Sequence, residues 1–287
     1  MRRGTSGAHN IRAGGIFLGM VWFLLGCSAA FPQTAQENAW NILQNGLRDQ
    51  NTNRRAAAVT ALGLIRDDPK AIESAEGALS DKKPIVRAAA ATALGQMDAR
   101  SSIPVLKEAL TDKDNRVFFA AADSLLSLGD PAGYDVYYEI LTGERKSGQN
   151  WIGEKKRLIA DERAMVLLAL GVGIGFAPYA GYGWMVTQEL SKDYGSPVRV
   201  NALKKLANDP DPRIGEALIK AAFDKHWTVR VAALSAIARH GDPSFLGRII
   251  PLMKDKKAPV RYTAAATVLR LSVLVTVEHA TQMATRQ

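Results

Sequence analysis

Hydrophobic and polar positions along this chain recur at the spacing of short helices. After the Asp-Pro pair at 68–69, the apolar residues Ile72, Ala75 and Leu79 follow three or four positions apart, as they would on one helix face. Aspartate suits the N-cap of a helix, and proline suits its first position, where the missing N–H does no harm. The same pair returns at 130–131, 211–212 and 242–243. The pattern therefore predicts a short helix after each pair.

A second helix is predicted in each unit, after a short polar turn, because alanine is concentrated there. The alanine runs lie at 56–58, 88–91, 120–122 and 264–266. Alanine has a high helix propensity and lets neighbouring helices approach closely. The chain is thus expected to be built from pairs of packed helices.

Aspartate and arginine six residues apart mark the repeat. The pairs are Asp49–Arg55, Asp81–Arg87, Asp193–Arg199, Asp224–Arg230 and Asp255–Arg261. Asp112–Phe118 and Arg157–Arg163 occupy the same frame with one member replaced. This gives seven repeats of about 31 residues, a period typical of a solenoid, in which each unit buries its face against its neighbours.

The motif formed by Asp81, Val86, Arg87, Ala90 and Leu94-Gly95 resembles the HEAT-repeat family, in particular the short bacterial repeats of phycobilin lyase-like proteins. The resemblance covers roughly residues 37–272. It implies an all-α, right-handed α-solenoid of about seven helix pairs, armadillo-like in its helical stacking. It also implies that the aspartates and arginines form a ladder between repeats, interrupted at Phe118 and Arg157, and that partners bind the concave face.

The start of the chain has the pattern of a secretory signal: a basic segment, an apolar run at 16–25 and small residues at 26–28. Ten apolar residues are too few to span a bilayer comfortably. The sequence Leu24-Leu25-Gly26-Cys27 looks like a bacterial lipobox, and Cys27 is the only cysteine. We favour a lipoprotein cleaved before Cys27 and lipidated there. Ordinary cleavage after Ala30 or Ala35, and an uncleaved anchor or misread start, stay open.

The predicted organisation is a signal peptide at 1–26, a linker at 27–36, the solenoid at 37–272 and a C-terminal extension at 273–287. The repeat frame is irregular at about 130–193, and insertions in a solenoid map to loops on one face. Residues 164–188 contain no charge and hold five glycines. We interpret them as a buried helix with a glycine-rich turn; a hairpin that contacts membrane or partner, and a spanning helix, are the alternatives.

Aromatic and basic residues gather in this irregular region, and tyrosine and tryptophan are frequent interface anchors. They form the candidate partner contact, which consists of Tyr134, Tyr137, Tyr138, Trp151, Lys155, Lys156, Arg157, Tyr179, Tyr182 and Trp184.

Charge and chemistry narrow the function classes. The formal net charge is +9, and 34 basic and 28 acidic residues remain without residues 1–26. The charges are interleaved, which argues against nucleic-acid binding as in HEAT-like DNA glycosylases. The four histidines are scattered singly, and no metal-ligand or nucleophile motif is present. HEAT-like enzymes that hydroxylate deoxyhypusine carry His-Glu pairs for iron, whereas this chain has only the reverse pair Glu278-His279.

The sequence therefore predicts an exported protein-interaction scaffold of a bacterial envelope, with no catalytic activity, cofactor or metal. Its expected partners are unidentified proteins. Its expected location is the cell envelope or periplasm, where a lipid anchor would attach it to the membrane. The alternative is a phycobilin lyase-like or other enzyme-associated module that binds a small ligand or an acceptor protein. Export argues against that alternative, because such chemistry belongs in the cytoplasm.

Overall fold

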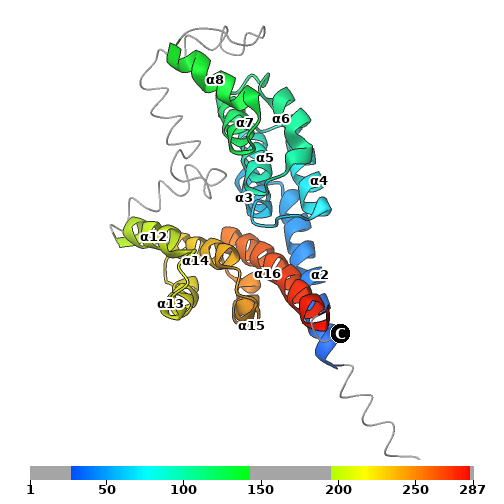
Figure 1. Ribbon diagram of the computed structural model, residues 1–287, viewed down its shortest axis with the longest axis vertical. Coiled ribbons are helices and arrows are strands. Elements are labelled where there is room, and N and C mark those ends of the chain that lie inside the picture. Colours follow the sequence, from blue (N-terminus) through cyan, green and yellow to red (C-terminus); the bar gives the residue numbers. More distant parts are fainter. Residues whose placement is uncertain (1–26, 143–194, 285–287) are drawn as a thin grey trace, which may run out of the picture.

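The computed structural model describes residues 27–142 and 195–284, and every regular element in these two ranges is helical (Figure 1). The N-terminal half consists of α2 (Cys27–Leu47), α3 (Thr52–Leu62), α4 (Pro69–Ala78), α5 (Pro84–Gln96), α6 (Ile103–Ala109), α7 (Asn115–Ser127) and α8 (Pro131–Thr142). The C-terminal half consists of α12 (Gly195–Leu206), α13 (Pro212–Ala222), α14 (Trp227–His240), α15 (Leu246–Ile249) and α16 (Ala258–Ala284).

Helices begin at the predicted prolines, because the preceding aspartate caps them. The Asp68 carboxylate accepts the amides of Lys70 and Ala71 at 2.9 and 3.0 Å, and α4 starts at the proline between. Asp130 and Asp211 cap α8 and α13 in the same way. The fourth start, after Asp242, gives only 3-10 turns around the four-residue α15. Pro251 explains this break, because proline disrupts the helix that precedes it.

The second helix of each repeat, which we call the B helix, forms the core layer. The B helices are α3, α5 and α7 in one half and α12, α14 and α16 in the other. Close approach depends on small residues: a Cβ on Gly95 of α5 would lie 2.5 Å from the Ser124 hydroxyl of α7. That hydroxyl donates to the Ala91 carbonyl at 2.8 Å, so a polar bond also joins the two helices. This glycine is the one in the Leu-Gly repeat motif.

The last repeat packs against the first. Helix α16 lies alongside α2 and also contacts α3, and the two halves diverge from this junction (Figure 1). The B helices therefore form one row in the order α12, α14, α16, α3, α5, α7. Stacking within each half follows chain order, as the repeat pattern predicts, but the row joins the two halves through the end of the chain and its beginning. The architecture is an α-solenoid.

Gly46 of α2 makes the junction possible. A Cβ at this position would lie 2.6 Å from the Tyr262 ring of α16 and 2.7 Å from the Cβ of Ala58 in α3. Tyr262 is only 4% exposed, so the ring has little room to move away. Two long helices and a short one thus meet at a residue without a side chain.

Two predicted boundaries differ from the structure. Helix α2 includes residues 27–36, which were expected to form a linker, and it buries Ala39 and Leu43 against its neighbours. Helix α16 continues to Ala284 with no break at residue 272. The reason is the same for both: each helix is the packing partner of the other. No helix within the described ranges is both long and apolar enough to cross a membrane.

Candidate functional site

The charged residues of the repeat motif join neighbouring B helices. Nε and Nη2 of Arg55 donate to the two carboxylate oxygens of Asp81 at 2.9 and 3.1 Å, a paired geometry that arginine forms well with carboxylates. The third nitrogen, Nη1, donates to the backbone carbonyl of Asp49 at 2.8 Å. The carboxylate of Asp81 also accepts the Lys83 amide at 2.8 Å. The Asp81 carboxylate thus accepts hydrogen bonds both from a backbone amide of its own turn and from the arginine of the neighbouring repeat.

The same arrangement returns along the row. Arg87 donates to Asp112 at 2.7 and 2.9 Å, and Arg230 pairs with Asp255 at 2.9 Å. Arg199 reaches Asp224 at 3.4 Å and is more exposed, at 43% of its side chain. These pairs form the ladder between repeats.

The ladder changes the pKa of its aspartates. Burial alone would raise the pKa of Asp81, but the hydrogen bonds from Arg55 and from the Lys83 amide outweigh burial and lower it below its ordinary value. The pKa of Asp112 is lowered too: burial opposes the shift, and Arg87 and the Asp114 amide produce it. These carboxylates are therefore held in the charged form, as structural ion pairs require.

The ladder stops at α7 and changes at the junction. Phe118 occupies the arginine position, is fully buried and packs edge-on against Phe119 at 5.0 Å between ring centroids. Arg261 keeps the bond to its own repeat, from Nη1 to the Asp255 carbonyl at 2.8 Å. Asp49 forms an ion pair with Arg54 at 3.4 Å. Asp193 and Arg157 lie outside the described residues.

Three of the candidate partner-contact residues lie on α8. Tyr134 is 50% exposed and stacks on Tyr138 with 5.9 Å between the ring centroids. Tyr137 is half-buried and donates a hydrogen bond to Asp123, and burial followed by this bond raises the pKa of the phenol. The other members, Trp151, Lys155, Lys156, Arg157, Tyr179, Tyr182 and Trp184, lie outside the described residues, as does the 164–188 stretch.

A cavity of about 400 Å³ lies where the two halves meet, and we call it the junction cavity. Sequence reasoning missed it. Most of its lining comes from one repeat position, nine residues after the ladder position, in or just beyond the ends of five consecutive B helices of the row. The residues at that position are Asn208, Arg239, Arg270, Leu64 and Gln96. The sequence shows that these five residues share a repeat position, but not that α16 lies beside α3, so it could not reveal the cavity.

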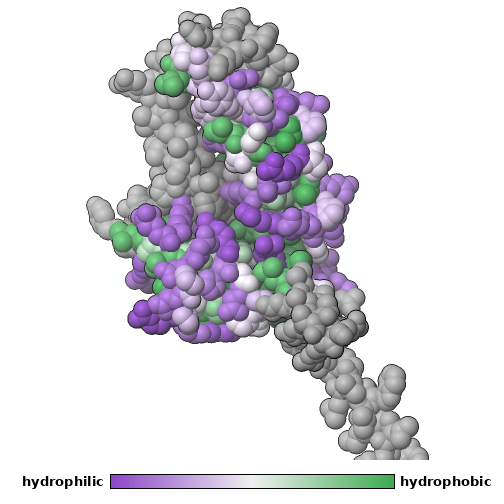
Figure 2. Space-filling model, in the orientation of Figure 1, coloured by the Kyte–Doolittle hydropathy of each residue, from purple (hydrophilic) through white to green (hydrophobic). Residues whose placement is uncertain are grey.

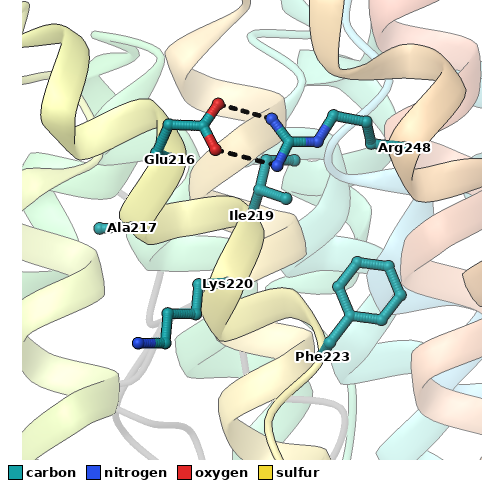
Figure 3. Close-up of a pocket in the computed structure, with 6 residues that line it drawn as sticks. All are labelled: Glu216, Ala217, Ile219, Lys220, Phe223 and Arg248. Carbon is teal, nitrogen blue, oxygen red and sulfur yellow. Dashed lines mark hydrogen bonds and ion pairs between the residues drawn. The ribbon is translucent and has the colours of Figure 1, made fainter.

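A second, shallower hollow of about 630 Å³ lies between α13 and α15 (Figure 3). Arg248 of α15 reaches across to Glu216 of α13, with nitrogen–oxygen distances of 2.6 and 2.9 Å. Phe223, which is 53% exposed, follows the last residue of α13, and its ring and the Lys220 side chain lie on opposite sides of the helix (Figure 3). The surface around α13 and α15 is mostly hydrophilic (Figure 2). The paired charges satisfy each other, so this hollow has little chemistry to offer a ligand.

In the described part of the chain, no three His, Cys, Asp or Glu side chains lie close enough together to hold a metal ion. His240 contacts the Ala207 carbonyl through Nδ1 at 3.2 Å and stacks on Phe245. His226 precedes α14 at its N-cap position.

Paired helices, a shared ladder and one row of B helices define a helical-repeat solenoid. A family model of HEAT repeats matches residues 41–126, 75–147 and 185–270, about two thirds of the chain in total. The protein belongs to the HEAT-repeat family. No curated protein matches the chain.

One solved structure similar to this chain is that of human deoxyhypusine hydroxylase in complex with glycerol. The identity is 19% and the TM-score 0.32, over 83% of this chain and 97% of that chain. This finding corrects the expectation that the chain is not an enzyme: the solved structure is that of an enzyme. At this TM-score, the match supports no statement about an activity of this chain.

Proposed function

We propose that the protein is an interaction scaffold of the bacterial cell envelope, held at a membrane by lipid on Cys27 and binding partner proteins through α8. Membership of the HEAT-repeat family supports the scaffold role, because stacked helix pairs present a long surface whose outer residues are free to vary.

Exposed apolar residues on α7 and α8 carry the proposal, and we call them the α8 surface. Tyr134, Tyr138 and Leu141 follow each other at four and three residues, so they share one helix face. Tyr134 is 50% exposed and Leu141 84%, and Leu126 of α7 adds a leucine that is 45% exposed. Grouped exposed apolar side chains are typical of interaction sites. Tyrosine in addition supplies a large contact area that can still form a hydrogen bond.

The signal-like start and the single cysteine support the anchor. Helix α2 begins at Cys27, so cleavage before this residue removes none of the described helices. Two or more acyl chains give stable membrane attachment.

The test uses the tagged full chain, cross-linked in cells and then purified. Tyr134→Ser combined with Leu141→Ser is expected to remove specific partners from the captured proteins while the circular dichroism spectrum stays that of the parent. Val273→Ser is the matched control, because Val273 is an apolar residue of α16 that is 40% exposed. An identical partner profile for the double variant and the parent would overturn the assignment of the α8 surface.

The anchor is tested separately. Cys27→Ser is expected to lose radiolabelled lipid and to leave the membrane fraction, whereas Ser28→Ala should keep both. Equal labelling of Cys27→Ser and the parent would contradict lipidation at this residue, without affecting the α8 result.

A further inference from the structure

The junction cavity is lined by residues from both halves of the molecule, and its charged lining residues are all arginines. Arg239 on α14 and Arg270 on α16 occupy the same repeat position on adjacent B helices, and both line the cavity. Arg66, which follows the end of α3, adds a third guanidinium from the N-terminal half. None of the described residues that line the cavity is acidic.

These arginines are not explained by the ladder. Arg66 and Arg270 form no ion pair with any other described residue, unlike the five ladder and cap arginines that do. Like charges that line one hollow repel each other, and an anion bound in the hollow offsets this repulsion. A cluster of this kind therefore favours an anion.

The neighbouring lysine responds to the same charge. The pKa of Lys204 on α12 is lowered, first by burial and then by the positive charge of Arg239. The positive charge of Arg239 on α14 thus acts on a neighbouring residue of α12.

Uncharged polar groups complete the lining. Gln96 ends α5, Asn208 follows α12, and Ser235 of α14 is 4% exposed. Leu64 and Ala238 add apolar wall. Binding sites for small molecules combine a mostly preformed hollow with a few convergent polar groups, and about 400 Å³ lies within their usual size range.

We propose that the junction cavity binds a small phosphate-bearing anion, held by Arg66, Arg239 and Arg270. Guanidinium groups match phosphate oxygens with paired hydrogen bonds, and three of them suit a doubly charged group better than a single carboxylate. The cavity is larger than phosphate alone, which leaves room for an organic part against Leu64 and Ala238. This inference does not rest on the proposed scaffold role or on the anchor.

Isothermal titration of the full chain with inorganic phosphate and with phenyl phosphate tests the proposal at constant ionic strength. We expect binding of at least one probe, with Kd raised about tenfold or more in Arg66→Gln and in Arg270→Gln, as for loss of a charge-assisted hydrogen bond. Arg270→Lys should bind more tightly than Arg270→Gln but less tightly than the parent, because lysine keeps the positive charge and lacks the paired donors of the guanidinium group. Arg213→Gln is the control: it removes the same charge from an outer side chain that is 89% exposed.

Each outcome decides something. Tighter binding of phenyl phosphate identifies an organic phosphate as the ligand class, and binding of inorganic phosphate alone identifies the free ion. Either result supports the site, provided that the arginine variants weaken binding and Arg213→Gln does not. Absence of binding by both probes, or equal weakening of binding by Arg213→Gln, overturns it. Melting temperatures of the variants show that each is folded.

Discussion

At the scale of single residues, each of the ladder aspartates Asp81 and Asp112 stabilises both the turn of its own repeat and the contact with the neighbouring repeat. Because Asp81 and Asp112 each accept an arginine and a backbone amide, neutralising one carboxylate weakens a turn and a repeat interface together. The repeat frame identifies these aspartates and arginines, and the resemblance to HEAT repeats implies that they pair between repeats. Phe118 shows the limit: the frame identifies its position but not that the pocket there is filled by packed rings.

The ladder predicts how stability depends on pH. The folded pKa of Asp81 and Asp112 is lowered below the unfolded value of about 4, so their stabilisation is complete above that value and is lost as pH falls through the folded pKa. We expect the urea midpoint of the parent to fall as the pH drops below about 4. Asp112→Asn should start from a lower midpoint at pH 7 and lose less on acidification. Parallel curves for the variant and the parent would refute this account.

At the scale of elements, local sequence predicts where a helix starts better than what it packs against. The Asp-Pro pairs at 68–69 and 211–212 specify helix starts through interactions within a few residues. Residues 27–36, assigned to a linker from the sequence, begin α2, whose Ala39 and Leu43 are buried and which packs against α16 at the other end of the chain. No local pattern encodes that contact.

The glycines offer a matched test of this packing. Gly46→Ala places a methyl group 2.6 Å from the Tyr262 ring, and we expect it to destabilise the fold by about 1–3 kcal/mol, as overpacking of a core does. Gly77→Ala, in the last turn of α4 with nothing within 4 Å of the added Cβ, should instead be neutral or stabilise by up to about 1 kcal/mol. Chemical denaturation of the two variants measures both effects. If Gly46→Ala were as stable as Gly77→Ala, the close packing of α2 on α16 would be wrong.

At the scale of the whole molecule, the junction between α16 and the N-terminal half explains why the cavity could not be predicted from the sequence. The position nine residues after the ladder position is visible in the chain, but its arginines gain meaning only when α16 is placed beside α3. Repeats stacked strictly in chain order would have left Arg66 far from Arg270. The solenoid class was therefore predictable, whereas the cavity was not.

Removing the end of the chain tests this arrangement. Deletion of residues 258–287 is expected to expose the Ala39–Leu43 face of α2 and to speed amide hydrogen exchange there, while amides of α5 and α7, which pack on each other, remain protected. Deletion of residues 285–287 alone, beyond the end of α16, is the control and should leave exchange unchanged. Slow exchange in α2 after the longer deletion would show that α16 is not its partner.

The contact between α2 and α16 also bears on how the protein is made. More than 200 residues separate the end of α2 from the start of α16. The apolar face of α2, the first described helix to be synthesised, therefore stays exposed until α16 has been synthesised. Contacts so distant in sequence slow folding and leave apolar surface open in the meantime. In a solenoid stacked in chain order, each new repeat extends one tip. Here the final repeat closes the middle of the row, and the molecule becomes one body only when its last helix has been made.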